Sequence, residues 1–420
     1  MGISSALYSG ISGLNTNGNA MSVLGNNIAN TNTIGFKASR TVFSDLLATT
    51  ISGSGGTSQV GRGTQLSTVD NLFSQGTFEN TESGTDLAIE GEGFFIVKPN
   101  VGEQSFYTRA GAFRFDKSGV LVNPEGLKVQ GKAFDANGNL SVGDPTDIKV
   151  DIGTLIQAKP TSSINLTTNL DANAQVVAFD PLNPATTSNY ATSTRIFDTL
   201  GNTHLLTTYF NITGPGSWTW NAMVDSADVT TPDAGPYTLV GSGNLTFDAN
   251  GNLTAGSVGT TNAGALDWIN GSDPALQLNF AFQTTQYSSD SVVISQAQDG
   301  YGAGNLVKIS IDGAGIVTAN YSNGQQIKVS QVALAKFPNV GGLSKAGGNL
   351  YAASDNSGAP RVGIPSSELG TIFTNALEQS NVDLAQEFVK MITTQRGFQA
   401  NSKIITTTDE MLGELINLKR

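Results

Sequence analysis

Residues 3–28 read ISSALYSGISGLNTNGNAMSVLGNNI, and this stretch decides the fold at one end of the chain. Its apolar residues recur every seven positions, at Leu7, Leu14, Met21 and Ile28, with Leu24 beside the same line. A seven-residue step places these side chains along one stripe of an α-helix. We therefore predict an amphipathic helix over residues 3–28 that buries this stripe.

The C-terminal end of the chain repeats this pattern over a longer stretch. Its apolar residues fall on one seven-residue line, with Phe388 beside it: Leu377, Leu384, Met391, Phe398, Ile405 and Leu412. Acidic and basic residues surround this single apolar seam, as they do in a coiled coil. We predict a helix of about 40 residues that starts near Leu377 and is about 60 Å long.

The N-terminal helix needs a packing partner in order to form. Residues 1–36 contain no charged side chain, whereas a helix surface in water usually carries Lys and Glu. Gly10, Gly13, Gly18 and Gly25 each cost about 0.8–1 kcal/mol relative to Ala. We predict that neighbouring copies of the chain supply the missing contacts. A monomeric two-helix stalk is the alternative that the pattern leaves open.

The overall composition excludes several classes of protein. The chain has 420 residues, a net charge of −12 and no cysteine. The acidic balance and the lack of any basic run argue against a nucleic-acid partner. The sequence has neither an apolar run long enough to span a membrane nor the pattern of a cleavable secretory signal peptide. Without cysteine the chain has no disulfides and no cysteine metal site. We also expect no cofactor.

The middle of the chain favours β structure. From about Asn71 the apolar pattern alternates, and we expect strands at Leu87–Val97, Phe106–Phe115, Leu127–Phe134 and Ile148–Ile152, among others. Between residues 160 and 291 charge falls while Thr and Asn rise, which indicates an inserted domain.

We predict a multidomain, mainly β fold with long terminal α-helices and a nested architecture. Residues 1–70 with 363–420 form a terminal helical coiled-coil polymerisation domain that includes a connector. Residues 71–158 with 292–362 form a discontinuous inner β domain, and residues 159–291 form an inserted outer β domain. This nesting brings both termini to the same end of the molecule.

The sequence gives little support for catalysis or metal binding. His204 is the only histidine, and it lies in an alternating segment without a nucleophile motif. The two DANGNL strings, at Asp135 and Asp248, resemble the start of a calcium loop but lack its final Glu, so we interpret them as turns. Trp218 and Trp220 could form a sugar-stacking face, although strand packing is the simpler interpretation. We predict no catalytic and no metal-binding residue.

Three stretches resemble one bacterial family. NNIANTNTIGFKASR, from Asn26 to Arg40, resembles the N-terminal signature of flagellar rod and hook proteins, and residues 87–97 with 106–123 resemble their first β domain. Residues 376–420 resemble their C-terminal helix almost throughout, whereas the resemblance fades between about 160 and 290. The positions that carry the family motif are Asn26, Asn27, Ala29, Asn30, Gly35, Phe36, Gln395, Arg396, Gln399 and Asn401.

This resemblance implies a self-assembling structural protein rather than an enzyme. The large inserted segment favours the hook type of subunit, which forms a curved, flexible tube that couples motor torque to the filament. The implied partners are further copies of the chain, the distal rod, the hook cap, the hook–filament junction proteins and the flagellar type III export apparatus. The implied location is the extracellular flagellar hook, attached to the basal body and without membrane insertion.

Other functions remain open at this point. A distal rod subunit would assemble into straight, stiff tubes. A secreted β-rich adhesin or glycan-binding protein would use Trp218 or Trp220, and a hydrolase would need a pair of carboxylates that the sequence does not single out.

Overall fold

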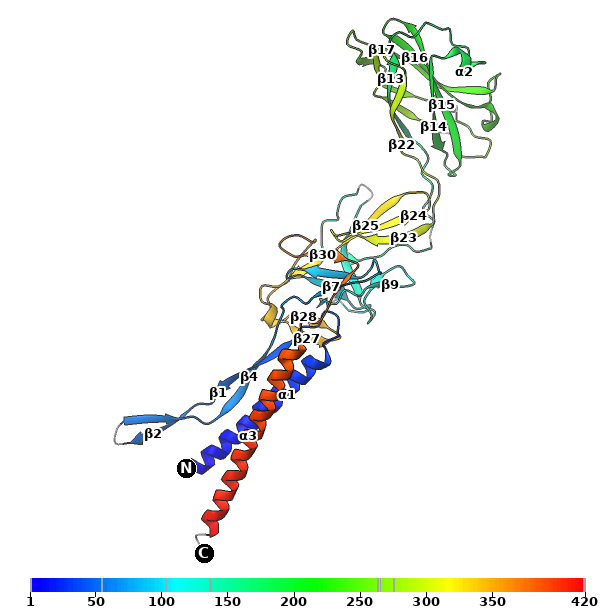
Figure 1. Ribbon diagram of the computed structural model, residues 1–420. Coiled ribbons are helices and arrows are strands. Elements are labelled where there is room, and N and C mark those ends of the chain that lie inside the picture. The colour runs from blue at the N-terminus through cyan, green and yellow to red at the C-terminus, as the bar shows by residue number, and fades with distance from the viewer. Residues whose placement is uncertain are drawn as a thin grey trace. The chain divides into compact units, whose positions relative to one another are not determined.

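The computed structural model describes residues 2–53, 56–102, 104–135, 138–153, 155–262, 264, 266–274 and 276–417. The chain divides into two compact units (Figure 1). The first comprises Met1–Ile152, Ile309–Ala319 and Ile327–Arg420, and the second comprises Gly153–Lys308 and Asn320–Gln326. Within the described residues, no helix is both long and apolar enough to cross a bilayer. The split of the first unit into a helical and an inner β domain remains a prediction.

Two helices and a connector form one end of the first unit. Helix α1 spans Gly2–Ala29, as predicted, and helix α3 spans Leu384–Asn417. The connector, residues 29–70, is rich in Gly and Ser, yet it forms regular β structure. Strand β1 (Ser39–Asp45) pairs with β4 (Thr64–Asn71), and β2 (Thr49–Gly53) pairs with β3 (Gly56–Val60), both antiparallel. It therefore forms a long two-part hairpin beside α1 (Figure 1).

The rest of the first unit consists of short strands. These are β5 (Phe78–Asn80), β6 (Leu87–Glu90), β7 (Phe94–Lys98), β8 (Phe106–Thr108), β9 (Arg114–Phe115), β10 (Leu121–Val122), β11 (Lys128–Ala133) and β12 (Thr146–Asp147). After the inserted segment follow β23 (Leu306–Ile311), β24 (Ile316–Tyr321), β25 (Gln326–Val332), β26 (Leu334–Lys336), η2 (Val340–Gly342), β27 (Ser344–Gly347), β28 (Leu350–Ala352), β29 (Arg361–Gly363), β30 (Thr371–Thr374) and β31 (Ala376–Glu378).

The main sheet of this unit has the order β23-β24-β25-β11-β7-β8-β28-β27. One apolar core cluster on it includes Phe94, Tyr107 and Phe337, whose rings meet edge to face. Two further antiparallel pairs, β5 with β31 and β6 with β30, join the segment after the connector to the segment before α3. This strand pairing brings the C-terminal end of α1 close to the N-terminal end of α3.

Three of the strand predictions for this unit were wrong in detail. Phe106–Phe115 forms the two separate strands β8 and β9. Leu87–Val97 forms two strands, because Gly91 adopts a φ of +113°, outside the strand region. Residues 148–152 form no regular strand: Ile148 N–H donates to the Val129 carbonyl, whereas Val150 N–H donates to the Gly119 carbonyl. Backbone groups that pair with different neighbours in turn do not build one ladder.

The second unit is a β-sandwich. One sheet contains β13 (Ser163–Asp171), β19 (Val258–Thr260), β20 (Asn279–Phe282), β21 (Thr285–Tyr287) and β22 (Val292–Gln298). The other contains β14 (Tyr190–Phe197), β15 (Thr203–Gly214), β16 (Ser217–Asp225), β17 (Tyr237–Phe247) and β18 (Leu253–Ala255), and the short helices are α2 (Pro184–Thr187) and η1 (Ser226–Asp228).

The tryptophans of this unit are core residues. Trp218 and Trp220 are at most 1% exposed, and the Trp220 ring lies 4.9 Å from that of Phe280 across the sandwich. Gly243 leaves room for Trp220, since a Cβ at that position would come within 2.6 Å of the indole nitrogen. The strand-packing interpretation is therefore confirmed, and these rings present no sugar-stacking face.

The turns and the single histidine also follow the prediction. In the second DANGNL string, Asp248 Oδ1 accepts the backbone N–H groups of Asn250 and Asn252, and Gly251 has a φ of +80°. Residues 136 and 137 of the first string lie outside the described residues. His204 lies in β15 and stacks on Trp268 at 3.6 Å, with its ring nitrogens 3.3 Å from Asp198 Oδ2 and 3.4 Å from Asp228 Oδ2.

Asp299 fastens the first strand of this unit. Its carboxylate accepts hydrogen bonds from Ser162 N, Ser162 Oγ and Ser163 N, and forms an ion pair with Lys159. Partial burial alone would raise the pKa of Asp299, but these partners, Ser162 first among them, outweigh it and lower the pKa to about 2. The carboxylate thus stabilises the fold in its charged form.

We expect Asp299→Asn to destabilise the second unit by about 1–2 kcal/mol near neutral pH. Because its folded-state pKa is lowered, the contribution of Asp299 is fully present above the unfolded value of about 3.9 and is lost as the pH falls through about 2. All three tryptophans lie in this unit, so indole fluorescence during urea unfolding reports on it alone. Asp290→Asn, at an exposed position, is the matched control. A stability difference that persists unchanged to pH 2 would contradict this assignment.

Candidate functional site: the terminal helix pair and its junction

Helices α1 and α3 pack against each other in antiparallel order. Gly10 of α1 faces Ile405 and Asn401, and Asn17 faces Gly397, so the register runs in opposite directions along the two helices. A Cβ at Gly13 would come within 2.6 Å of the Asn401 side chain. The glycines that weaken α1 as an isolated helix therefore permit close approach at Gly10 and Gly13. Gly18 and Gly25 have no such neighbour.

The structure places the predicted assembly residues of α1 on or beside this contact. Leu24 is buried, and Leu7, Leu14, Met21 and Ile28 are half-buried. One part of this apolar stripe packs against α3, and the other part is exposed on the surface. The single chain therefore covers part of the apolar stripe of α1 and leaves the rest available.

The predicted assembly residues of α3 are less covered. Met391 and Ile405 are half-buried, whereas Leu384, Phe388, Phe398 and Leu412 are exposed. Phe388 and Phe398 expose 48% and 44% of their surface, which is unusual for residues of this size in a single soluble chain. Further exposed apolar residues of α3 are Val389, Ile392, Ile404, Met411 and Ile416. One α1 helix is not enough to bury the seam of α3.

Leu377 does not belong to the helix, and its predicted place there was wrong. It lies in β31, opposite Glu79 of β5, and is buried in the first unit. Helix α3 starts later because Asp383 Oδ1 accepts the N–H groups of Ala385 and Gln386, which makes Asp383 the N-cap. The seven-residue step at Leu377 is therefore coincidental.

The helices meet the β structure at a junction formed by the segment from Asn26 to Ser39 with Glu378, Asn381 and Glu387. Asn27 lies at its centre: its Nδ2 donates to the Ser39 carbonyl (2.7 Å) and to Glu387 Oε2 (3.0 Å), and its Oδ1 accepts Ser39 N–H (2.9 Å). One buried amide thereby ties the end of α1 to β1 and to the first turn of α3.

Asn381 makes a second tie in the junction. Its Oδ1 accepts Ala38 N–H (2.8 Å), and its Nδ2 donates to the Leu72 carbonyl (2.8 Å). Gly35 N–H donates to the Glu378 carbonyl (2.7 Å), and Gly35 has a φ of +69°. A Cβ at Gly35 would come within 2.5 Å of Ala110 N, so only glycine fits this turn.

Lys37 and Glu378 of the junction form a buried ion cluster with Arg109. Lys37 Nζ lies 2.6 Å from Glu378 Oε1, and Arg109 Nη1 lies 3.4 Å from Glu378 Oε2. All three side chains are at most 2% exposed. Burial lowers the pKa of Lys37 and of Arg109 against the opposing effect of Glu378, and raises the pKa of nearby Tyr351 to about 12.

Backbone groups add further partners to this cluster, although Arg109 Nε is buried without a hydrogen-bond partner. Lys37 Nζ donates to the Ser74 carbonyl, Arg109 Nη2 donates to the Gly91 carbonyl, and Gly76 N–H donates to Glu378 Oε1. One carboxylate therefore compensates two buried cations from the connector and from the inner sheet. Because Glu378 directly precedes the segment that leads into α3, the cluster fixes both chain ends to the same sheet.

The structure brings together only part of the predicted family motif. Asn27, Gly35 and Phe36 lie in the junction, and Asn30 Nδ2 donates to the Asn26 carbonyl at the end of α1 (2.8 Å). Asn401 packs on Gly13 in the helix pair. The remaining motif residues are exposed. Asn26 and Ala29 lie at the end of α1, and Gln395, Arg396 and Gln399 lie on α3.

Sequence reasoning missed the polar partners of the junction: Lys37, Ser39, Arg109, Glu378, Asn381 and Glu387. One signal was present, because Lys37 is the first charged residue after 36 uncharged ones. A lysine at that place indicates a specific role but not its partner. Glu378 lies 341 residues away, and only the pairing of β5 with β31 brings it close.

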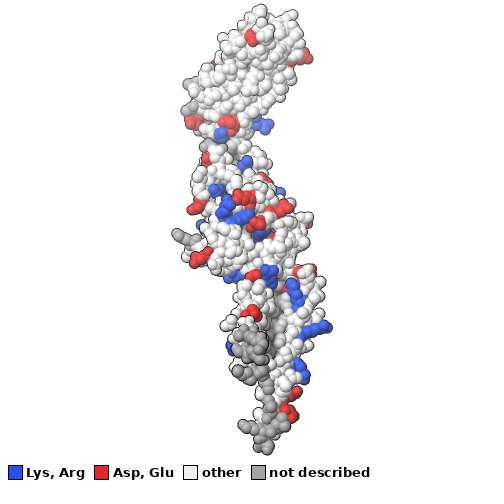
Figure 2. All heavy atoms as spheres, turned by 90° about the vertical axis from the view of Figure 1, so that its left-hand side faces the viewer, with Lys and Arg blue, Asp and Glu red and all other residues white. Residues whose placement is uncertain are grey.

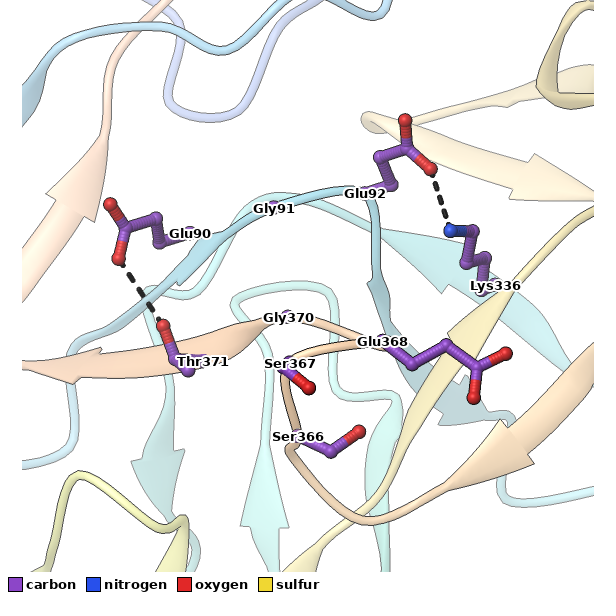
Figure 3. A pocket seen from close by; sticks show the side chains of 9 residues that line it. All are labelled: Glu90, Gly91, Glu92, Lys336, Ser366, Ser367, Glu368, Gly370 and Thr371. Atoms are coloured by element: carbon purple, nitrogen blue, oxygen red, sulfur yellow. Dashed lines mark hydrogen bonds and ion pairs between the residues drawn. The ribbon is translucent and has the colours of Figure 1, made fainter.

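The first unit also contains a polar hollow of about 500 Å³ (Figure 3). Three glutamates border it, and each has a partner: Glu92 pairs with Lys336 (2.8 Å), Glu90 accepts from Thr371 (3.3 Å), and Glu368 pairs with Arg361 (2.6 Å). The hydrogen bond to Lys336 lowers the pKa of Glu92. These carboxylates are arranged as ion pairs and hydrogen bonds, so this hollow is a weaker candidate than the helix pair.

Models of four flagellar families match successive parts of the chain. They are described as flagella basal body rod protein (residues 7–37), flagellar hook protein FlgE/F/G D1 domain (88–175), flagellar basal body protein FlaE D2 domain (165–301) and flagellar basal body rod FlgEFG protein C-terminal (374–418). The segment in which the resemblance fades thus has a family model of its own.

Relatives match the whole chain. The flagellar hook proteins FlgE of Borreliella burgdorferi and Treponema pallidum are 35% and 37% identical to it, with 99% of each chain covered. The flagellar hook protein FlgE of Escherichia coli is 35% identical over 99% of this chain and 100% of its own. The chain belongs to the flagellar hook protein family.

The family assignment decides between the interpretations that were open. The hook protein is a structural subunit of the flagellum, and this assignment is favoured over a distal rod subunit or an adhesin. The crystal structure of Helicobacter pylori flagellar hook protein FlgE2 has the same fold, with a TM-score of 0.54 and 16% identity, and covers 72% of this chain and 99% of its own.

Proposed function

We propose that copies of this hook protein polymerise through their terminal helices into a curved, flexible tube that transmits torque from the rod to the filament. The observation that carries the proposal is the exposed apolar seam of α3, which α1 of the same chain covers only in part. Further helices from neighbouring copies would complete its burial, as in a coiled coil. The self-assembly residues are then Leu7, Leu14, Met21, Leu24 and Ile28 of α1, with Leu384, Phe388, Met391, Phe398, Ile405 and Leu412 of α3.

The junction has a mechanical role in this proposal. Torque that passes between the helical core of a tube and its β domains would cross the segment from Asn26 to Ser39 and the segment that joins β31 to α3. Buried hydrogen bonds and the ion cluster make this link stiff, because each broken bond would leave a buried polar group without a partner. The second unit is suited to contacts that exchange, since neutral side chains cover most of its visible face (Figure 2).

The proposal extends to partners and location. A hook subunit meets the distal rod at one end of the tube and the hook cap and then the hook–filament junction proteins at the other, and the type III apparatus exports it. Its place would be extracellular and its role structural, without enzymatic activity. The rod and basal-body descriptions of three of the matching families support assembly next to the rod within the basal-body structure.

Deletion of residues 2–30 should abolish polymerisation. The truncated chain loses α1, so α3 has neither its intramolecular partner nor the stripe on which a lattice would depend. We expect short curved tubes from the full chain in electron micrographs and only monomers from the truncated chain at the same concentration. Indole fluorescence should show unchanged urea unfolding of the second unit, which controls for misfolding of that unit. Tubes formed by the truncated chain would refute the proposal.

A further inference from the structure

The C-terminal tip of α3 extends beyond the start of α1. The antiparallel register places Gly10 against Ile405 and Gly13 against Asn401, so the first described residue of α1 lies near Leu412. Residues 413–417 have no α1 turn to pack on, and Figure 1 shows the end of α3 beyond the start of α1. Ile416 is 69% exposed, and Met411 and Leu412 are exposed as well. The tip therefore presents an apolar surface that its own chain does not cover.

A hollow of about 430 Å³ lies on the other side of α1. Its lining comes from one face of α1 (Tyr8, Ile11, Ser12 and Asn15) and from the connector hairpin (Leu46, Leu47 and Arg62). These α1 positions lie on the face opposite to Gly10 and Gly13, which contact α3. Tyr8 and Ile11 are exposed, and Leu47 exposes 91% of its surface.

The hollow is a built feature of the fold. The hairpin is anchored to α1 by a hydrogen bond from Thr64 N–H to Ser12 Oγ (3.2 Å), and β1 and β4 are paired along their whole length. Its walls therefore keep their spacing without a partner. An apolar hollow between a helix and a hairpin is a suitable seat for the side chains of another helix.

We propose that this hollow receives the α3 tip of a second copy of the chain. The inference rests on the proposed polymerisation and names one contact within it. Both surfaces are apolar. Among the described residues, Arg62 is the charged one that lines the hollow, and the tip carries exposed Asp409, Glu410 and Glu414, which can pair with it. The connector hairpin thereby acts as a docking element rather than a passive linker.

The geometry also accounts for an open assembly. The tip and the hollow are different surfaces of the same chain, on opposite sides of α1, so one copy offers a tip to the next and receives a tip from the one before. Such a heterologous contact does not saturate in a dimer, and it builds a helical array when the rotation between successive copies does not close into a ring. Every copy inside the array buries its tip.

Cysteine cross-linking tests this contact directly, since the chain has no cysteine of its own. Two full-length variants, Leu47→Cys and Met411→Cys, are mixed, polymerised and treated with a short bis-maleimide. We expect a cross-linked heterodimer as the main product on a denaturing gel. The matched control replaces Leu47→Cys by Val101→Cys, which has the same exposure (90%) but lies in the inner sheet region, and should give little heterodimer.

The outcomes separate this inference from the proposed function. Tubes that form but yield no more heterodimer than the Val101→Cys control would overturn the docking contact and leave polymerisation intact. If the wild-type chain forms no tubes, the proposed function itself fails. If either cysteine variant does not polymerise, a second pair, Tyr8→Cys with Ile416→Cys, replaces the first and is judged by the same comparison.

Discussion

Glu378→Gln should lower the free energy of unfolding of the first unit by about 3–5 kcal/mol, the usual cost of removing one partner from a buried ion pair. The substitution leaves Lys37 and Arg109 buried without a counter-charge, and both pay desolvation that Glu378 now offsets. The first unit contains both long helices, so its unfolding can be followed by the helical circular dichroism signal of the monomer. We also expect the variant to polymerise poorly, because β31 leads directly into α3.

Two further variants test the cause of this loss. Glu79→Gln removes an exposed carboxylate that accepts from Gln379 on the neighbouring strand, and it should change stability by less than about 0.5 kcal/mol. Lys37→Met in the Glu378→Gln background removes one uncompensated cation and should recover part of the loss. If Glu378→Gln unfolds like the wild type, the cluster is not a stabilising element of the junction.

Gly13→Leu should separate the two terminal helices. The Cβ of a residue at this position would lie 2.6 Å from the Asn401 side chain, so either this side chain leaves its packed position or the two helices move apart. Overpacking of this kind costs about 1–3 kcal/mol. If the helix pair is the assembling element, the critical concentration for tube formation rises by about 5- to 150-fold, as pelleting of the polymer would measure.

The control for Gly13→Leu lies one and a half turns along the same helix. Gly18→Leu inserts the same side chain where no atom lies within 4 Å, and it replaces a poor helix former by a good one. It should leave the monomer as stable as the wild type, or up to about 1 kcal/mol more stable. Equal destabilisation by both substitutions would show that close approach at Gly13 is not the reason for this glycine.

Local patterns predicted the elements whose side chains repeat at a regular step. Helix α1 and strand β11 lie within a few residues of the expected segments, and the Asp248 turn has the expected form. The errors arose where a distant partner overrides the local pattern. Leu377 continues a helical repeat in sequence, yet it pairs with Glu79 in a sheet. The connector shows no strand pattern, yet β1 and β4 pair beside α1.

Only part of the candidate site could be predicted from the sequence. Apolar side chains that are buried on one face of a helix recur at a regular spacing. This spacing predicted the apolar seams of α1 and α3. Hydrogen-bonded polar groups carry no such period, and Asn27, Glu387 and Ser39 meet only when α1, α3 and β1 converge. For the same reason the sequence assigned a purely unfavourable role to Gly13, which the structure shows to be a contact position.

By itself the sequence determined the two terminal helices, the β-rich middle and the need of the helices for an apolar partner. These follow from side-chain periodicity and composition, which act over a few residues. Only the tertiary structure decided that one carboxylate holds two cations at the junction, that glycines set the spacing of the helix pair, and that a hairpin builds a hollow on α1. The physical reason is that these features depend on atoms hundreds of residues apart, which the fold alone brings within hydrogen-bond distance.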